Sequence, residues 1–136
     1  MYKKNISRRE IREIIFKLLF RVEFHDNDEM QEQFDMIEDE LGNIGETDIN
    51  YIKDKFSKIV ENIDTIDAEI NEKSQGWKSN RMGKVDLSII RLAVYEIKFE
   101  DDIPVKVSIN EAVELAKKFG TDDSASFVNG VLAKFV

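Results

Sequence analysis

Residues 103–132 read IPVKVSINEAVELAKKFGTDDSASFVNGVL, and this stretch predicts two short helices joined by a turn. Ser108 and Glu111 have the S-x-x-E spacing of a capping box, which marks a helix start. Pro104 is the only proline of the chain, and it can end the preceding helix because it has no backbone N–H. Gly120 stands at the expected end of the first helix, where a residue with a positive φ is favoured.

Further helices are predicted wherever apolar residues recur every three or four positions. Ser7 and Glu10 form another S-x-x-E pair, which predicts the start of a helix of about 18 residues. Its apolar residues form a single stripe: Ile11, Ile14, Ile15, Leu18, Leu19 and Val22. The remaining helices are expected from Met30 to Gly42, from Asp48, from Asp64 or Thr65 to Gly76, from Arg81 or Lys84 to Phe99, and from Asp122, Asp123 or Ser124.

The helix that ends at Phe99 is apolar around more than half of its circumference, which predicts the buried centre of the domain. No segment alternates apolar and polar residues for long enough to predict a strand. About seven helices joined by short loops therefore predict a compact all-α bundle, and residues 1–136 have the length of a single domain.

Composition excludes several classes of protein. The chain has no cysteine, so it has no disulfide, no zinc–thiolate site and no thiol nucleophile. His25 is the only histidine and has no partner at metal-ligand spacing. No phosphate-binding loop, dinucleotide fingerprint or nucleophile elbow occurs, so we expect neither catalysis nor a cofactor. No apolar run suits a signal peptide or a membrane span, which predicts a cytoplasmic protein.

Charge is distributed unevenly along the chain. The net charge is −8, yet residues 1–21 carry seven basic and two acidic side chains, a net charge of +5. This asymmetry favours a local contact with a polyanion such as RNA. Arginine binds phosphate through two N–H groups and stacks on bases. The alternative is that these cations pair with Glu10, Glu13 or the acidic middle of the chain. The candidate phosphate ligands are Lys3, Lys4, Arg8, Arg9 and Arg12.

A second candidate RNA contact lies near the start of the last helix. The Phe127 ring could stack on an unpaired base, and the Asn129 amide offers donors and acceptors to base edges. Lys106 and Lys134 could add positive charge. Ordinary core packing is the alternative for Phe127.

The ordered set of these residues resembles the NusB family of bacterial transcription antitermination factors. About 70 residues carry the resemblance, and residues 24–74 add only length and helicity. Besides residues 103–132, the segments that carry it are SRREIRE at 7–13, RM at 81–82, VD at 85–86 and IRLAVYE at 90–96.

The resemblance implies a fold of two small helical bundles that share the central helix. It implies binding of single-stranded boxA-type RNA in ribosomal-RNA leader transcripts, together with the small-subunit ribosomal protein NusE, to modify elongating RNA polymerase. It places the RNA near the first helix and near Asp123 at the last helix, and it assigns Phe20 and Asp86 to the NusE face. Some relatives dimerise, so the resemblance leaves monomer and homodimer open.

Two other functions are also compatible with the sequence. A protein-only helical adaptor would use the acidic surface without touching RNA. A stand-alone RNA-binding module would resemble the N-terminal domain of some RNA cytosine methyltransferases. RNA binding that weakens with salt would argue against the adaptor.

Overall fold

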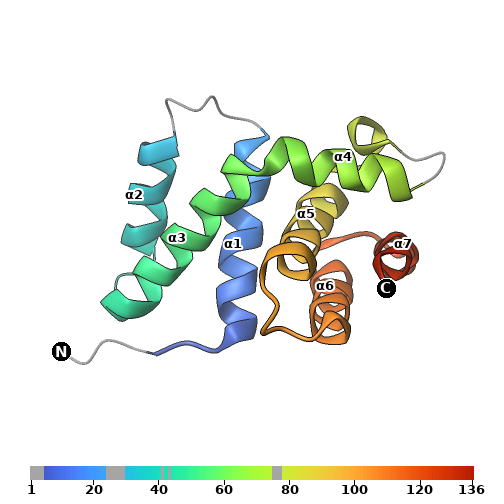
Figure 1. Ribbon diagram of the computed structural model, residues 1–136. Coiled ribbons are helices and arrows are strands. Elements are labelled where there is room, and N and C mark those ends of the chain that lie inside the picture. Colours follow the sequence, from blue (N-terminus) through green and yellow to red (C-terminus); the bar gives the residue numbers. More distant parts are fainter. Residues whose placement is uncertain (1–4, 24–29, 41, 43, 75–77) are drawn as a thin grey trace. The chain divides into compact units, whose positions relative to one another are not determined.

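The computed structural model describes residues 5–23, 30–40, 42, 44–74 and 78–136 (Figure 1). The described residues form seven α-helices and two 3₁₀ turns and contain no strand, so the all-α prediction is confirmed. The chain divides into two compact units, Met1–Val60 and Glu61–Val136. Within the described residues, no helix is both long enough and apolar enough to cross a lipid bilayer.

The first unit contains α1 (Arg8–Val22), α2 (Met30–Glu40) and α3 (Glu46–Glu61). The predicted stripe of α1 is largely confirmed, because Ile11, Ile15, Leu18 and Leu19 are buried. Between α2 and α3, the rings of Phe34 and Phe56 meet edge to face, with centroids 4.9 Å apart. Such contacts add to the free energy gained from apolar burial.

The Ser7–Glu10 capping box is confirmed at the start of α1. The Glu10 N–H donates to Ser7 Oγ at 3.1 Å, and the Ser7 N–H donates to Glu10 Oε1 at 3.3 Å. The two bonds satisfy N–H groups that have no partner inside the helix. The helix is 15 residues long, slightly shorter than expected.

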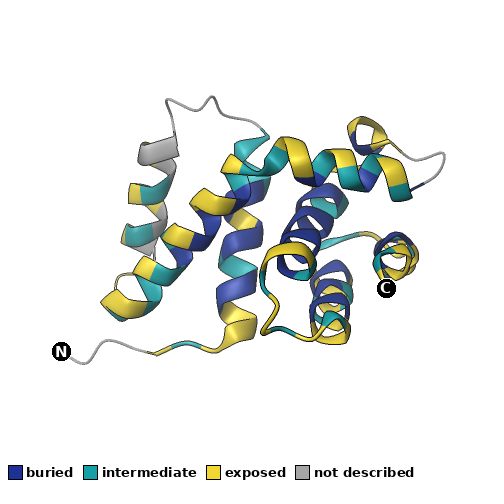
Figure 2. Cartoon of the chain, viewed as in Figure 1, coloured by how far each residue is buried: buried dark blue, intermediate teal, exposed yellow. Residues whose placement is uncertain are grey.

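The second unit contains α4 (Ile63–Lys73), η2 (Ser79–Arg81), α5 (Lys84–Phe99), α6 (Val105–Phe119), α7 (Ser124–Leu132) and η3 (Ala133–Phe135). Every residue from Leu87 to Glu96 in α5 is buried (Figure 2), which confirms the predicted buried helix.

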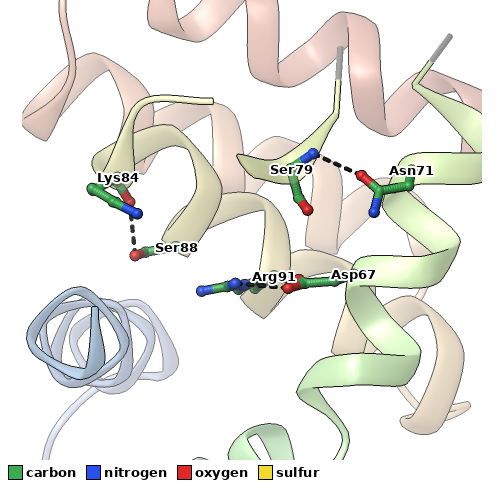
Figure 3. Close-up of polar contacts among 6 residues, drawn as sticks. All are labelled: Asp67, Asn71, Ser79, Lys84, Ser88 and Arg91. Carbon is green, nitrogen blue, oxygen red and sulfur yellow. Dashed lines mark hydrogen bonds and ion pairs between the residues drawn. The ribbon is translucent and has the colours of Figure 1, made fainter. Parts of the chain in front are cut away.

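Polar contacts join α4 to its neighbours in this unit (Figure 3). The Arg91 guanidinium of α5 donates two hydrogen bonds, of 2.8 and 2.7 Å, to the two carboxylate oxygens of Asp67. The Ser79 N–H of η2 donates to Asn71 Oδ1 at 2.7 Å. The bidentate pair fixes both the distance and the rotation of α5 against α4.

The predicted capping box at Ser108 and Glu111 is wrong. Helix α6 begins at Val105 after Pro104, so Ser108 lies inside the helix. Its hydroxyl donates instead to Glu96 Oε1 of α5 at 2.8 Å. A proline is tolerated at a helix start because the N–H groups of the first turn have no partner within the helix. Pro104 therefore opens α6, whereas α5 has already ended at Phe99.

Gly120 does end α6, but its φ of −93° contradicts the predicted positive value. The reason for glycine is space. A Cβ at this position would overlap the Ser124 side chain and lie 2.8 Å from the Ala116 carbonyl oxygen. The Thr121 N–H donates to Ser124 Oγ at 2.9 Å, which holds that side chain against the turn.

Two further helix starts differ from their predicted positions. Helix α3 begins at Glu46, so Asp48 lies in its first turn and is not its N-cap. Helix α4 begins at Ile63, just before the expected Asp64 or Thr65. The predicted end at Gly76 lies outside the described residues, as does His25.

Candidate nucleic-acid interface

The start of α1 presents two of the three predicted arginines to solvent. Arg8 and Arg9 are exposed, whereas Arg12 is buried, with only 8% of its surface exposed. Arg12 follows Ile11 at the edge of the apolar stripe, and its long aliphatic stem suits such a position. Lys3 and Lys4 lie outside the described residues.

Glu10, which interrupts the basic run, is occupied by the helix cap. Its carboxylate accepts from the Ser7 N–H and from the Ser7 hydroxyl, the latter at 3.2 Å. Because Ser7 Oγ already accepts from the Glu10 N–H, a phosphate at this helix end would depend mainly on the arginine side chains. The carboxylate also offsets the unfavourable placement of cations at the positive end of the helix dipole.

Tyr51 of α3 is a neighbour of this site that the sequence did not indicate. The Arg8 guanidinium carbon lies 4.9 Å from the centroid of the Tyr51 ring. The Lys55 ammonium lies 5.8 Å from the same centroid, although Lys55 is only 4% exposed. No sequence pattern links a tyrosine on α3 to an arginine on α1, because the contact exists only after both helices pack.

The second predicted segment lies in the other compact unit. Asp123 and Asn129 are exposed at the start and middle of α7, and Phe127 is half-buried. Phe127 is therefore neither a fully buried core residue nor a freely exposed ring. Lys106 in the first turn of α6 and Lys134 in η3 are exposed.

The two predicted partner residues lie in different units. Phe20 of α1 is half-buried, and its ring centroid is 6.4 Å from that of Phe16. Asp86 lies in the first turn of α5, and its Oδ1 atom is buried without a hydrogen-bond partner among the described residues. A buried carboxylate oxygen of this kind is unusual, because desolvation without a hydrogen bond costs free energy.

Acidic side chains are numerous along the chain. Within the described part of the chain, no group of three His, Cys, Asp or Glu residues could hold a metal ion.

Comparison of the sequence with known proteins identifies close relatives. The model of the NusB family matches residues 9–136. Transcription antitermination protein NusB of Agathobacter rectalis is 65% identical over 130 residues, covering 96% of this chain and 99% of that protein. The protein of the same name from Lachnoclostridium phytofermentans is 54% identical over 131 residues, with coverage of 96% and 99%.

Solved structures share the fold. The structure of T. maritima NusB has a TM-score of 0.83 and 35% identity, covering 97% of this chain and 92% of that one. A crystal structure of the antitermination factors NusB and NusE in complex with dsRNA has a TM-score of 0.82 and 26% identity, covering 94% of each chain. By sequence over nearly its whole length and by fold, the chain belongs to the NusB family.

Proposed function

We propose that this chain is a transcription antitermination factor that binds boxA-type RNA together with NusE and thereby modifies elongating RNA polymerase. The observation that carries the RNA part of this proposal is the exposed pair Arg8 and Arg9 at the capped start of α1. It is supported by the antitermination relatives and by the solved NusB–NusE complex with dsRNA.

Each compact unit supplies one kind of RNA contact in this proposal. In the first unit, Arg8 and Arg9 bind phosphates, with Lys3 and Lys4 proposed to add charge. In the second unit, Phe127 stacks on a base and Asn129 hydrogen-bonds a base edge. Lys106 and Lys134 add positive charge there. Arg12 is the weakest of the proposed phosphate ligands because its side chain is buried.

The NusE contact is proposed at Phe20 and Asp86. Both side chains are half-buried, so part of each remains accessible to a partner protein. We further propose that the chain acts in the cytoplasm and binds RNA without catalysing a reaction on it.

Fluorescence anisotropy with a boxA-like single-stranded RNA tests the proposal. The same measurement with a scrambled strand and with a base-paired form of the RNA establishes which form is selected. Three to five phosphate contacts predict a slope of log affinity against log salt of roughly −2 to −3.5. Addition of NusE should tighten binding, because two proteins then share one RNA.

The variant R8A/R9A should lose most of this binding. The matched control K17A/K58A also removes two positive charges from the first unit. Lys17 and Lys58 are exposed and form ion pairs with Glu13 at 3.5 Å and with Asp54 at 3.1 Å, away from the helix cap. Equal losses in both variants would show that net charge alone matters. No RNA binding with or without NusE would favour the protein-only adaptor instead.

A further inference from the structure

We infer that Tyr51 of α3 is a positioning residue that holds the Arg8 guanidinium ready for an RNA phosphate. The inference rests on the proposed RNA-binding function and adds to it a residue on a second helix. It follows from the 4.9 Å separation between the Arg8 guanidinium carbon and the Tyr51 ring centroid.

The backbone just before Arg8 is held by two contacts. Arg8 is the first residue of α1, directly after the Ser7 cap. One residue before the cap, the Ile6 N–H donates to Asp48 Oδ2 of α3 at 3.1 Å. Helix α3 therefore holds the main chain through Asp48 and the arginine side chain through Tyr51.

An arginine that lies over an aromatic ring can still bind phosphate. The attraction uses the face of the aromatic ring, whereas the five N–H donors of a guanidinium lie in its own plane. An arginine held over a ring thus keeps its donors available at its edges. Because the side chain is already ordered, less conformational freedom is lost when the phosphate binds.

Lys55 adds a second positive charge beside the same ring. Its ammonium is 5.8 Å from the Tyr51 centroid, compared with 4.9 Å for the Arg8 guanidinium carbon. Two cations that share one aromatic neighbour raise the positive potential around it, which favours a bound anion. Arg8 is exposed and Tyr51 is half-buried, so an RNA strand can reach the guanidinium.

A double-mutant cycle on RNA affinity tests the inference. Y51L should weaken binding by about two- to fivefold, the effect of one exposed cation–π pair. Y51F keeps the ring and should bind like the wild type. In an R8A background, Y51L should cause no further loss, because Tyr51 acts through Arg8.

Two control variants separate the effect of Tyr51 on the position of Arg8 from a general loss of folded structure. R8K keeps the charge and the fold but lacks the planar group, so Y51L should have less effect in its presence. K73A breaks a comparable pair in the other unit, where the Lys73 ammonium lies 5.5 Å from the Phe135 ring centroid, and should leave RNA affinity unchanged. Each variant's unfolding midpoint shows whether it is folded.

The possible results separate failure of the Tyr51 inference from failure of the proposed RNA-binding function. Normal wild-type binding with equal affinity for Y51L overturns the inference and leaves the function intact. Additive losses from Y51L and R8A also overturn it, because Tyr51 would then act independently of Arg8. Absence of RNA binding by the wild type would overturn the function and the inference together.

Discussion

The Ser108 hydroxyl donates a 2.8 Å hydrogen bond to Glu96 Oε1, and both side chains are buried. The bond links α6 to α5 in the interior of the second unit. A carboxylate in such a place requires hydrogen-bond donors, because its desolvation is otherwise uncompensated.

Removal of this donor should destabilise the protein. We expect S108A to lower the free energy of unfolding by about 1–3 kcal/mol, because the Glu96 oxygen then loses a partner inside the fold. Urea denaturation measures the loss. The control S126A changes an exposed serine of α7 and should have little effect. Equal stability of S108A and wild type would contradict the structural role of the bond.

Gly120 and Gly130 should respond in opposite directions to alanine. At Gly120 the new methyl group overlaps the Ser124 side chain, so G120A should cost about 1–3 kcal/mol. At Gly130, inside α7, a Cβ meets no atom within 4 Å. Alanine there should stabilise the helix by about 0.5–1 kcal/mol. Thermal unfolding of the two variants provides the comparison, and a stable G120A would refute the close approach.

The Arg91–Asp67 pair should depend on geometry as well as charge. D67A leaves the buried Arg91 guanidinium without its bidentate partner, and we expect a loss of about 3 kcal/mol. R91K keeps the charge but has a single nitrogen, which cannot reproduce the two parallel hydrogen bonds from two guanidinium nitrogens, so it should also be destabilised. K117A breaks an exposed pair with Glu114 and should cost under about 0.5 kcal/mol. If chemical denaturation gave R91K the same free energy of unfolding as the wild type, the requirement for a bidentate pair would be refuted.

The Lys98–Glu69 pair should make stability depend on pH. The Lys98 ammonium, which donates to Glu69 Oε1 at 2.9 Å, holds the pKa of that carboxyl below its ordinary value. The pair therefore stabilises the folded state above the unfolded-state pKa, and this contribution is lost as pH falls through the lower folded-state pKa.

K98A tests this dependence. The variant should be less stable than the wild type near neutral pH, by less than about 1 kcal/mol because both groups are partly exposed to solvent. The difference should disappear in acid, once Glu69 is protonated in both proteins. Unfolding midpoints between pH 2 and 7 measure it, and a difference that persists unchanged at the acid end would contradict the assigned cause.

Removal of the Asp123 charge should tighten RNA binding. Asp123 is exposed directly before α7, where its carboxylate would repel a nearby phosphate. D123N should therefore raise RNA affinity by roughly two- to fivefold at low salt, with a smaller gain as salt screens the repulsion. D101N removes an exposed carboxylate from the loop before α6 and serves as the control. A gain of equal size in both variants would point to net charge rather than position.

A periodic apolar stripe made α1 predictable from the sequence, and apolar residues around more than half of the circumference made α5 predictable. The residues from Leu87 to Glu96 are buried as their apolar content indicated. The Ser7 capping box was also predictable, because its two partners are three positions apart. Such local signals require no knowledge of how the helices pack.

Two of the wrong predictions concern residues whose contacts reach a second helix. Ser108 has the spacing of a cap, but the buried carboxylate on α5 recruits its hydroxyl. Gly120 ends a helix, a position where glycine with a positive φ is common. In the structure, however, glycine is needed because the nearby Ser124 side chain leaves no room for a Cβ. Tyr51 was missed because its partner Arg8 comes from a distant part of the sequence.

The continuous buried segment of α5 should affect how the second unit unfolds and how fast its amide protons exchange. All residues from Leu87 to Glu96 are buried. Fraying of the helix ends therefore does not expose the backbone of this segment. Amide protons in this segment should therefore exchange with deuterium only through the largest opening of the unit, whereas those of the ends of α7 exchange through small local ones. Their protection factors would report the free energy of that cooperative opening directly.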